Sequence, residues 1–133
     1  MWLSVQQAKR IWTSLVLKPA VFSWDVEVGF KWFYGLMNNE LDLKPDELRE
    51  FFDDCILKVH PWIVTDLGFK CFDRFFKAVN CQEGKLIPRG GEFYWMNTVD
   101  LTGTEYIWSL ISSPRNQDVA KKAIKLLKEM RAR

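Results

Sequence analysis

The sequence predicts an all-α protein of about six helices in stacked antiparallel hairpins, with one long loop near residues 81–101. Three observations predict this class. Apolar residues recur at spacings of three and four along most of the chain, which gives each α-helix one apolar stripe. Capping residues, prolines and glycines separate the striped segments. The last two segments form a helical hairpin with a face of small residues, a layout common in stacked α-repeats.

The first expected helix begins after Ser4, which opens a Ser-x-x-Gln capping box that ends at Gln7. Its apolar stripe comprises Val5, Ala8, Ile11, Trp12, Leu15 and Val16. Pro19 ends the helix because a proline inside a helix removes a hydrogen bond and clashes with the preceding turn.

The second expected helix has Ser23 as its N-cap and runs to about Met37. Its inward residues are Val26, Phe30, Phe33, Tyr34 and Met37. Gly29 and Gly35 lie inside it, and each costs about 1 kcal/mol of helix stability relative to alanine. Close packing against a neighbouring element would explain both glycines.

The third expected helix starts with Pro45 at its first position and closes before His60-Pro61, and Thr65 caps a fourth that ends near Asn80. The third stripe comprises Leu48, Phe51, Phe52, Cys55 and Ile56. The fourth stripe is the richest in phenylalanine and comprises Phe69, Phe72, Phe75, Phe76 and Val79. This helix is built to bury a wide face.

Residues 81–101 lack a helical period, so we expect a long loop there, with a β-hairpin over Lys85–Ile87 and Phe93–Met96 as the alternative. The segment combines cations, aromatic rings and glycines. We therefore predict that it is the main interaction surface, because arginine, tyrosine and tryptophan are enriched at binding hot spots. The candidate contact residues are Lys85, Arg89, Phe93, Tyr94 and Trp95. In the competing interpretation, Phe93–Met96 folds back as a lid over the core.

The fifth expected helix covers residues 103–112, with a capping box over Thr102–Glu105 and with Leu101 packed on Tyr106. The sixth starts near Gln117. Its stripe comprises Val119, Ala120, Ala123, Ile124, Leu127 and Met130.

The residues that could carry chemistry form no catalytic or metal-binding pattern. The cysteines are three in number, without a C-x-x-C pair: Cys55, Cys71 and Cys81. His60, the only histidine, precedes a proline at a helix end, so we expect a structural or capping role. Asp53 and Asp54 point about 100° apart on a helix and make a poor acid–base pair. We expect no catalytic residue, metal or cofactor.

The bulk composition fits a single domain over residues 1–133. The net charge of +2 is too weak to favour nucleic acid, and the basic end of the chain is typical of a solvated helix face. No apolar run reaches about 18 residues, so no membrane span is expected. The odd number of cysteines, without a signal peptide, predicts free, mostly buried thiols in a reducing cytoplasmic or nuclear compartment.

Several stretches carry a likeness to a known protein family. The strongest is Val64–Leu86, above all from Gly68 onward. The others are Gln7–Trp12, Gly29–Tyr34 with Leu36-Met37, Asp100–Trp108 and Val119–Glu129. In this order, they resemble segments of the giant fat-facets-type ubiquitin-specific proteases. The likeness covers nearly the whole chain and is thinnest over residues 86–98.

The resemblance implies an ARM/HEAT-like α-solenoid fragment from the non-catalytic helical-repeat region of a large thiol-dependent deubiquitinase. That family's Cys and His boxes have no counterpart here, so no catalytic residue is carried over. The implied role is a protein-interaction scaffold, whose partners would be substrates, adaptors or the parent's protease domain. The alternatives are a stand-alone helical adaptor unrelated to ubiquitin and, more weakly, a nucleic-acid binder that uses the basic last helix.

Overall fold

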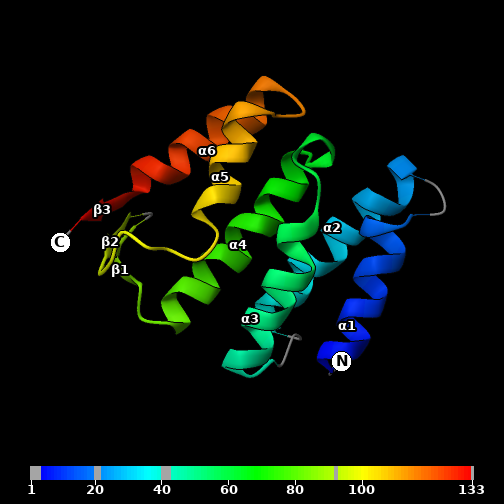
Figure 1. Ribbon diagram of the computed structural model, residues 1–133, viewed down its shortest axis with the longest axis horizontal. Coiled ribbons are helices and arrows are strands. Elements are labelled where there is room, and N and C mark those ends of the chain that lie inside the picture. Colours follow the sequence, from blue (N-terminus) through cyan, green and yellow to red (C-terminus); the bar gives the residue numbers. More distant parts are fainter. Residues whose placement is uncertain (1–3, 20–21, 40–42, 92, 133) are drawn as a thin grey trace.

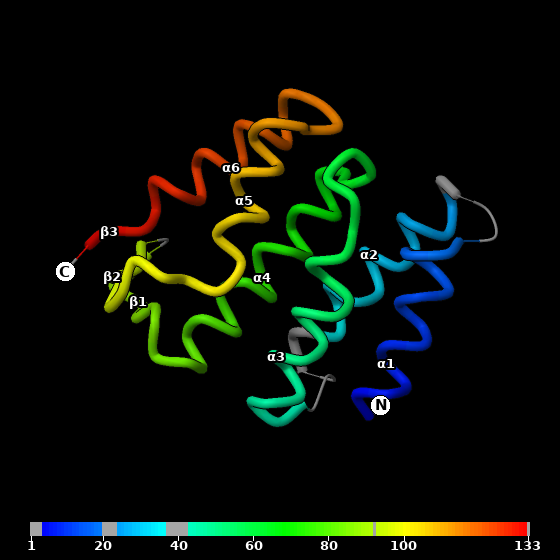
Figure 2. Tube along the Cα trace, in the orientation of Figure 1, coloured from blue at the N-terminus to red at the C-terminus, as the bar shows by residue number. Residues whose placement is uncertain are grey.

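In the computed structural model, the chain is a stack of helices with a small sheet at one end (Figure 1). The structure describes residues 4–19, 22–39, 43–91 and 93–132, without the side chains at 22, 23 and 37–39. The predicted inward side chain of Met37 therefore lies outside the description. The tube in Figure 2 runs from α1 at one end of the long axis to β3 at the other. This arrangement confirms the predicted all-α stack.

Six α-helices and three short strands occur in the described residues. The helices are α1 (Val5–Trp12), α2 (Phe22–Asn39), α3 (Pro45–Asp54), α4 (Asp66–Gln82), α5 (Thr104–Ser112) and α6 (Gln117–Glu129). The strands are β1 (Leu86–Gly90), β2 (Phe93–Met96) and β3 (Met130–Ala132). A π-helical turn over Thr13–Leu17 extends α1, and two 3₁₀ turns, Ile56–Lys58 and Pro61–Ile63, link α3 to α4.

The local signals for helix starts are confirmed at three of the predicted positions. The Ser4 hydroxyl accepts from the Gln7 N–H at 3.2 Å, and the Gln7 side chain accepts from the Ser4 N–H at 3.0 Å. Pro45 is the first residue of α3, and Thr65 Oγ1 caps α4 by accepting from the Gly68 N–H at 3.1 Å. The N-cap predicted for the second helix was wrong, because α2 already includes Phe22 and Ser23.

The core forms around α4, which packs against α2, α3 and α6. All five residues of its predicted stripe are buried, which confirms the strongest prediction of the sequence. Phe75 contacts Phe51 with ring centroids 5.3 Å apart, and Phe51 stacks on Phe33 at the same separation. Trp12 meets Phe33 edge-on at 5.1 Å and donates its indole N–H to the Cys55 carbonyl at 3.1 Å. Rings from four helices therefore interlock.

Close packing accounts for two of the three glycines that lie inside the described helices. A Cβ at Gly29 would lie 2.6 Å from Val16 Cγ2, and one at Gly68 would lie 2.6 Å from the Phe30 ring. Both glycines therefore allow α2 to approach its neighbours closely. A Cβ at Gly35 would meet no atom within 4 Å, so the close packing expected there is not found within the described residues.

The capping box predicted over Thr102–Glu105 was wrong. The N-cap of α5 is Gly103, whose φ of 95° lies in the left-handed region. The Thr102 hydroxyl instead donates to Glu83 at 2.8 Å, and the buried Asn80 amide pairs with the Thr102 backbone at 2.8 and 2.9 Å. Because Thr102 makes these tertiary hydrogen bonds, it does not cap α5.

The predicted register of the last helix needs two corrections. Ile124 is 39% exposed, whereas Leu126, which the predicted stripe omits, is buried. The apolar face therefore follows Val119, Ala123 and Leu126, a spacing of four and three. The helix also ends at Glu129, and Met130 belongs to β3.

Part of the region expected to be a loop is the small sheet, as the hairpin alternative proposed. β1 and β2 pair antiparallel, with Leu86 opposite Met96 and Ile87 opposite Trp95. β3 then adds beside β2 in parallel, which places Arg131 next to Trp95. The sheet order is β1-β2-β3.

Candidate interaction surface

The cysteine thiols and His60 occupy structural positions. Cys55 and Cys71 are buried, and Cys81 is half-buried, so the prediction of free, mostly buried thiols is confirmed. Burial raises the pKa of Cys55 to about 11 and also raises the pKa of Cys71 and Cys81, which disfavours the nucleophilic thiolate. His60 Nδ1 accepts from the Trp62 N–H at 3.1 Å and caps a 3₁₀ turn, as predicted.

The adjacent carboxylates of α3 are held by different cations. Asp53 pairs with Arg49 at 2.8 Å, whereas Asp54 pairs with Lys9 of α1 at 2.9 Å. The two side chains therefore do not converge on one point, in agreement with the sequence argument. The described residues contain no group of three or more His, Cys, Asp or Glu side chains that could hold a metal ion. None of the described helices is long and apolar enough to cross a membrane.

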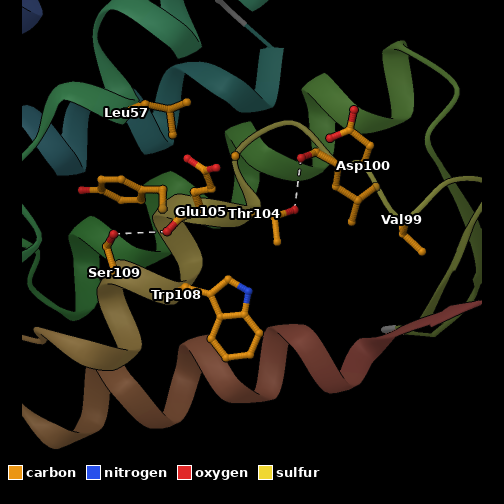
Figure 3. Close-up of a pocket in the computed structure, with 10 residues that line it drawn as sticks. Leu57, Val99, Asp100, Thr104, Glu105, Trp108 and Ser109 are labelled. Atoms are coloured by element: carbon orange, nitrogen blue, oxygen red, sulfur yellow. Dashed lines mark hydrogen bonds between the residues drawn. The ribbon is translucent and has the colours of Figure 1, made fainter.

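A hollow of about 610 Å³ lies beside the start of α5 (Figure 3). Its aliphatic hydroxyl groups, on Thr104 and Ser109, each donate to a backbone carbonyl at 3.1 Å. Asp100 and Glu105 supply carboxylates, while the exposed Trp108 indole points away from the Glu105 carboxylate in Figure 3. This lining contains no nucleophile with an adjacent base, so it offers no catalytic arrangement.

Two of the five candidate contact residues make contacts within the fold. Tyr94 packs against the core, and the Lys77 ammonium lies 5.4 Å from its ring centroid. Lys85 donates to Thr102 Oγ1 at 3.0 Å and lies 3.5 Å from the Glu83 carboxylate. Both side chains therefore hold the sheet onto α4 and the loop that follows it.

The other three candidates lie on the solvent-facing side of the sheet, which is opposite to the side of Tyr94. The Arg89 guanidinium stacks over the Trp95 ring at 4.3 Å from its centroid. Phe93 is 45% exposed, and the Arg131 guanidinium lies 5.9 Å from its ring centroid. We call this surface the outer sheet face, and it comprises Ile87, Arg89, Phe93, Trp95 and Arg131.

Alternation along the strands explains why the aromatic side chains divide between the two sides. Successive strand residues point to opposite faces of a sheet, so Tyr94 points inward while Phe93 and Trp95 point outward. Direct partners share a face, which places Arg131 beside Trp95. The sequence argument missed Arg131 because the predicted apolar stripe of the last helix continued through Met130. No local sequence pattern predicts a strand at this position.

The two arginines of the outer sheet face lack an ion-pair partner among the described residues. Arg131 Nη1 donates to the Lys128 carbonyl at 2.5 Å, which leaves most of its five donors available. Both guanidinium groups lie near aromatic rings, which do not neutralise their charge. The face is thus rich in arginine and aromatic rings and lies on three paired strands.

The fold defines the chain as an α-helical repeat segment with a small sheet at one end. The family model described as the UBP24/USP9X/USP9Y ARM repeat matches residues 1–80. This match covers more than half of the sequence, and the chain belongs to this family.

Curated relatives extend the likeness over nearly the whole chain. The chain is 45% identical over 130 residues to mouse "Ubiquitin carboxyl-terminal hydrolase 9Y" and 46% identical over 132 residues to fruit fly "Probable ubiquitin carboxyl-terminal hydrolase FAF". It is 31% identical over 127 residues to mouse "Ubiquitin carboxyl-terminal hydrolase 24". These alignments cover 96–98% of this chain but only 5% of each relative. They confirm the resemblance to the fat-facets-type proteases.

Proposed function

We propose that this chain is a protein-interaction segment of a large deubiquitinase and that the outer sheet face is its contact surface. The observation that carries the proposal is the pairing of Arg89 with Trp95 beside the exposed Phe93. Arginine and tryptophan are the residue types that dominate binding hot spots. Both side chains sit on paired strands, so little conformational entropy is lost when a partner binds.

The parent activity is proposed from the names of the relatives. A ubiquitin carboxyl-terminal hydrolase requires a reactive thiolate, and the pKa values of the thiols described here are raised by burial. The hydrolysis of ubiquitin conjugates would therefore take place elsewhere in a longer protein, with this segment serving as scaffold. Family membership also argues against the alternative of a helical adaptor unrelated to ubiquitin.

We expect the partners to be proteins: substrates, adaptors or the parent's protease domain. The basic residues of α6 are a weaker candidate surface for nucleic acid, because part of their charge is neutralised within the fold. Lys122 lies 3.4 Å from the Asp66 carboxylate. Free, mostly buried thiols fit the expected cytoplasmic or nuclear location.

Site-specific photocrosslinking in cells tests the proposed surface. Benzoylphenylalanine is placed at Phe93 on the outer sheet face or, as the matched control, at Trp62, which is 65% exposed on a 3₁₀ turn. We expect discrete protein crosslinks from position 93 that decrease with Arg89→Glu, identified by mass spectrometry. Equal crosslinking from both positions, or none from position 93, contradicts the proposal.

A further inference from the structure

The two outer strands of the sheet differ in what their free edges offer. The backbone N–H and C=O groups of successive strand residues point alternately to the two sides of the strand. The Asn97 N–H donates to the Lys85 carbonyl at 2.9 Å, so the backbone carbonyl of Lys85 faces β2. By alternation, the backbone polar groups of Leu86 and Pro88 in β1 face away from β2. Pro88 has no N–H, so this edge lacks a donor where an added strand would need one.

The outer edge of β3 is not paired with another described strand. The backbone N–H of Asn97 faces β1, so by alternation the backbone groups of Met96 and Tyr94 face β3. In the parallel register of β2 and β3, the backbone groups of Arg131 then bond to those of Met96 and Tyr94. Alternation then directs the Ala132 N–H and C=O away from β2. In the described part of the chain, no strand lies on that side of β3. Figure 1 shows β3 at the end of the molecule, directly after α6.

Side chains beside this edge define the chemistry of an added strand. Arg131 lies on the outer sheet face and has no carboxylate partner in the described chain. Met130 lies on the inner side and is 6% exposed. An added strand places alternate side chains on these two sides, so it would need an acidic residue next to Arg131 and an apolar residue toward Met130.

We propose that the free edge of β3 binds an extended protein segment of alternating acidic and apolar residues, which adds as a fourth strand. Main-chain hydrogen bonds to Ala132 hold the segment, and charge-assisted hydrogen bonds from Arg131 select its acidic residues. Arg89, stacked on Trp95, adds a second positive charge to the same face. This inference rests on the proposed function of the outer sheet face and names the class of its partner.

Fluorescence anisotropy with a short fluorescein-labelled peptide of alternating Glu and Val tests the inference. We expect saturable binding, and Arg131→Glu weakens it by about tenfold or more because a charged pair becomes repulsive. Lys121→Glu makes the same charge change at an exposed residue of α6 and is expected to weaken binding less than about twofold. Circular dichroism confirms that both variants remain folded.

Two further peptides separate strand addition from simple charge attraction on the unaltered protein. A Lys–Val peptide of the same length is expected not to bind. A Glu–Val peptide N-methylated at alternate residues keeps its charge but loses edge donors, and we expect its binding to be abolished. Retained binding of the methylated peptide, equal losses in the two variants, or no binding of the Glu–Val peptide each overturns the inference. Crosslinking from position 93 without binding of the Glu–Val peptide leaves the proposed function intact and refutes the strand addition alone.

Discussion

Phe76→Ala provides the sharpest test of the core. The Phe76 side chain is fully buried and stacks on Phe72 with ring centroids 5.6 Å apart. It also lies under Gly103, where an added Cβ would come within 3.3 Å of its ring. Helices α4 and α5 are thus both held around it, and the cavity left by alanine has little means of collapsing. A buried Phe→Ala change costs about 3–5 kcal/mol.

That loss is a large share of the stability of a domain of this size, about 7–20 kcal/mol at 0.05–0.15 kcal/mol per residue. It corresponds to a decrease in melting temperature of about 10–20 °C. Thermal and urea unfolding followed by circular dichroism measure it. The matched control is Phe93→Ala, the same change at a side chain that is 45% exposed, which is expected to cost less than about 1 kcal/mol. Equal losses in the two variants would refute the assignment of Phe76 to the core.

Three further predictions concern chemistry, backbone and charge. The isolated chain should not cleave a fluorogenic ubiquitin substrate, because burial raises the pKa of its thiols; turnover abolished by Cys71→Ala would contradict this. Gly103→Ala should destabilise the fold by about 1–3 kcal/mol, because φ is 95° and a Cβ would lie 2.9 Å from the ring of Phe52, whereas Gly35→Ala in an open helix position should stabilise it by up to about 1 kcal/mol in urea unfolding. Burial raises the Glu83 pKa, but the hydrogen bonds from Arg49 and Thr102 outweigh this effect and lower the pKa below 4.5. The stability from Glu83 is therefore fully present above pH 4.5 and is lost as the pH falls through the folded-state pKa, so Glu83→Gln should flatten the dependence of unfolding on acid pH.

The candidate surface was predictable only in part. The composition of residues 81–101 pointed to the segment that forms the hairpin, and three of its five candidate residues face solvent on one side of the sheet. Which side each residue takes depends on pairing register, because a shift of one residue reverses every side chain. The sequence left two structures open for this segment, a loop or a hairpin. The contacts of Leu86 and Tyr94 with the core decided which side of the sheet faces inward.

The sequence by itself determined the helices and most of their buried faces. Helix spacing and caps are local properties, so Ser4, Pro45, Thr65 and the phenylalanine stripe of α4 could be read directly. Only the tertiary structure decided the rest. Thr102 forms long-range hydrogen bonds with Asn80 and Glu83, and the N-cap of α5 is Gly103 instead. β3 forms because β2 offers its free edge to residues that follow a helix, and this long-range pairing leaves no local trace in the sequence.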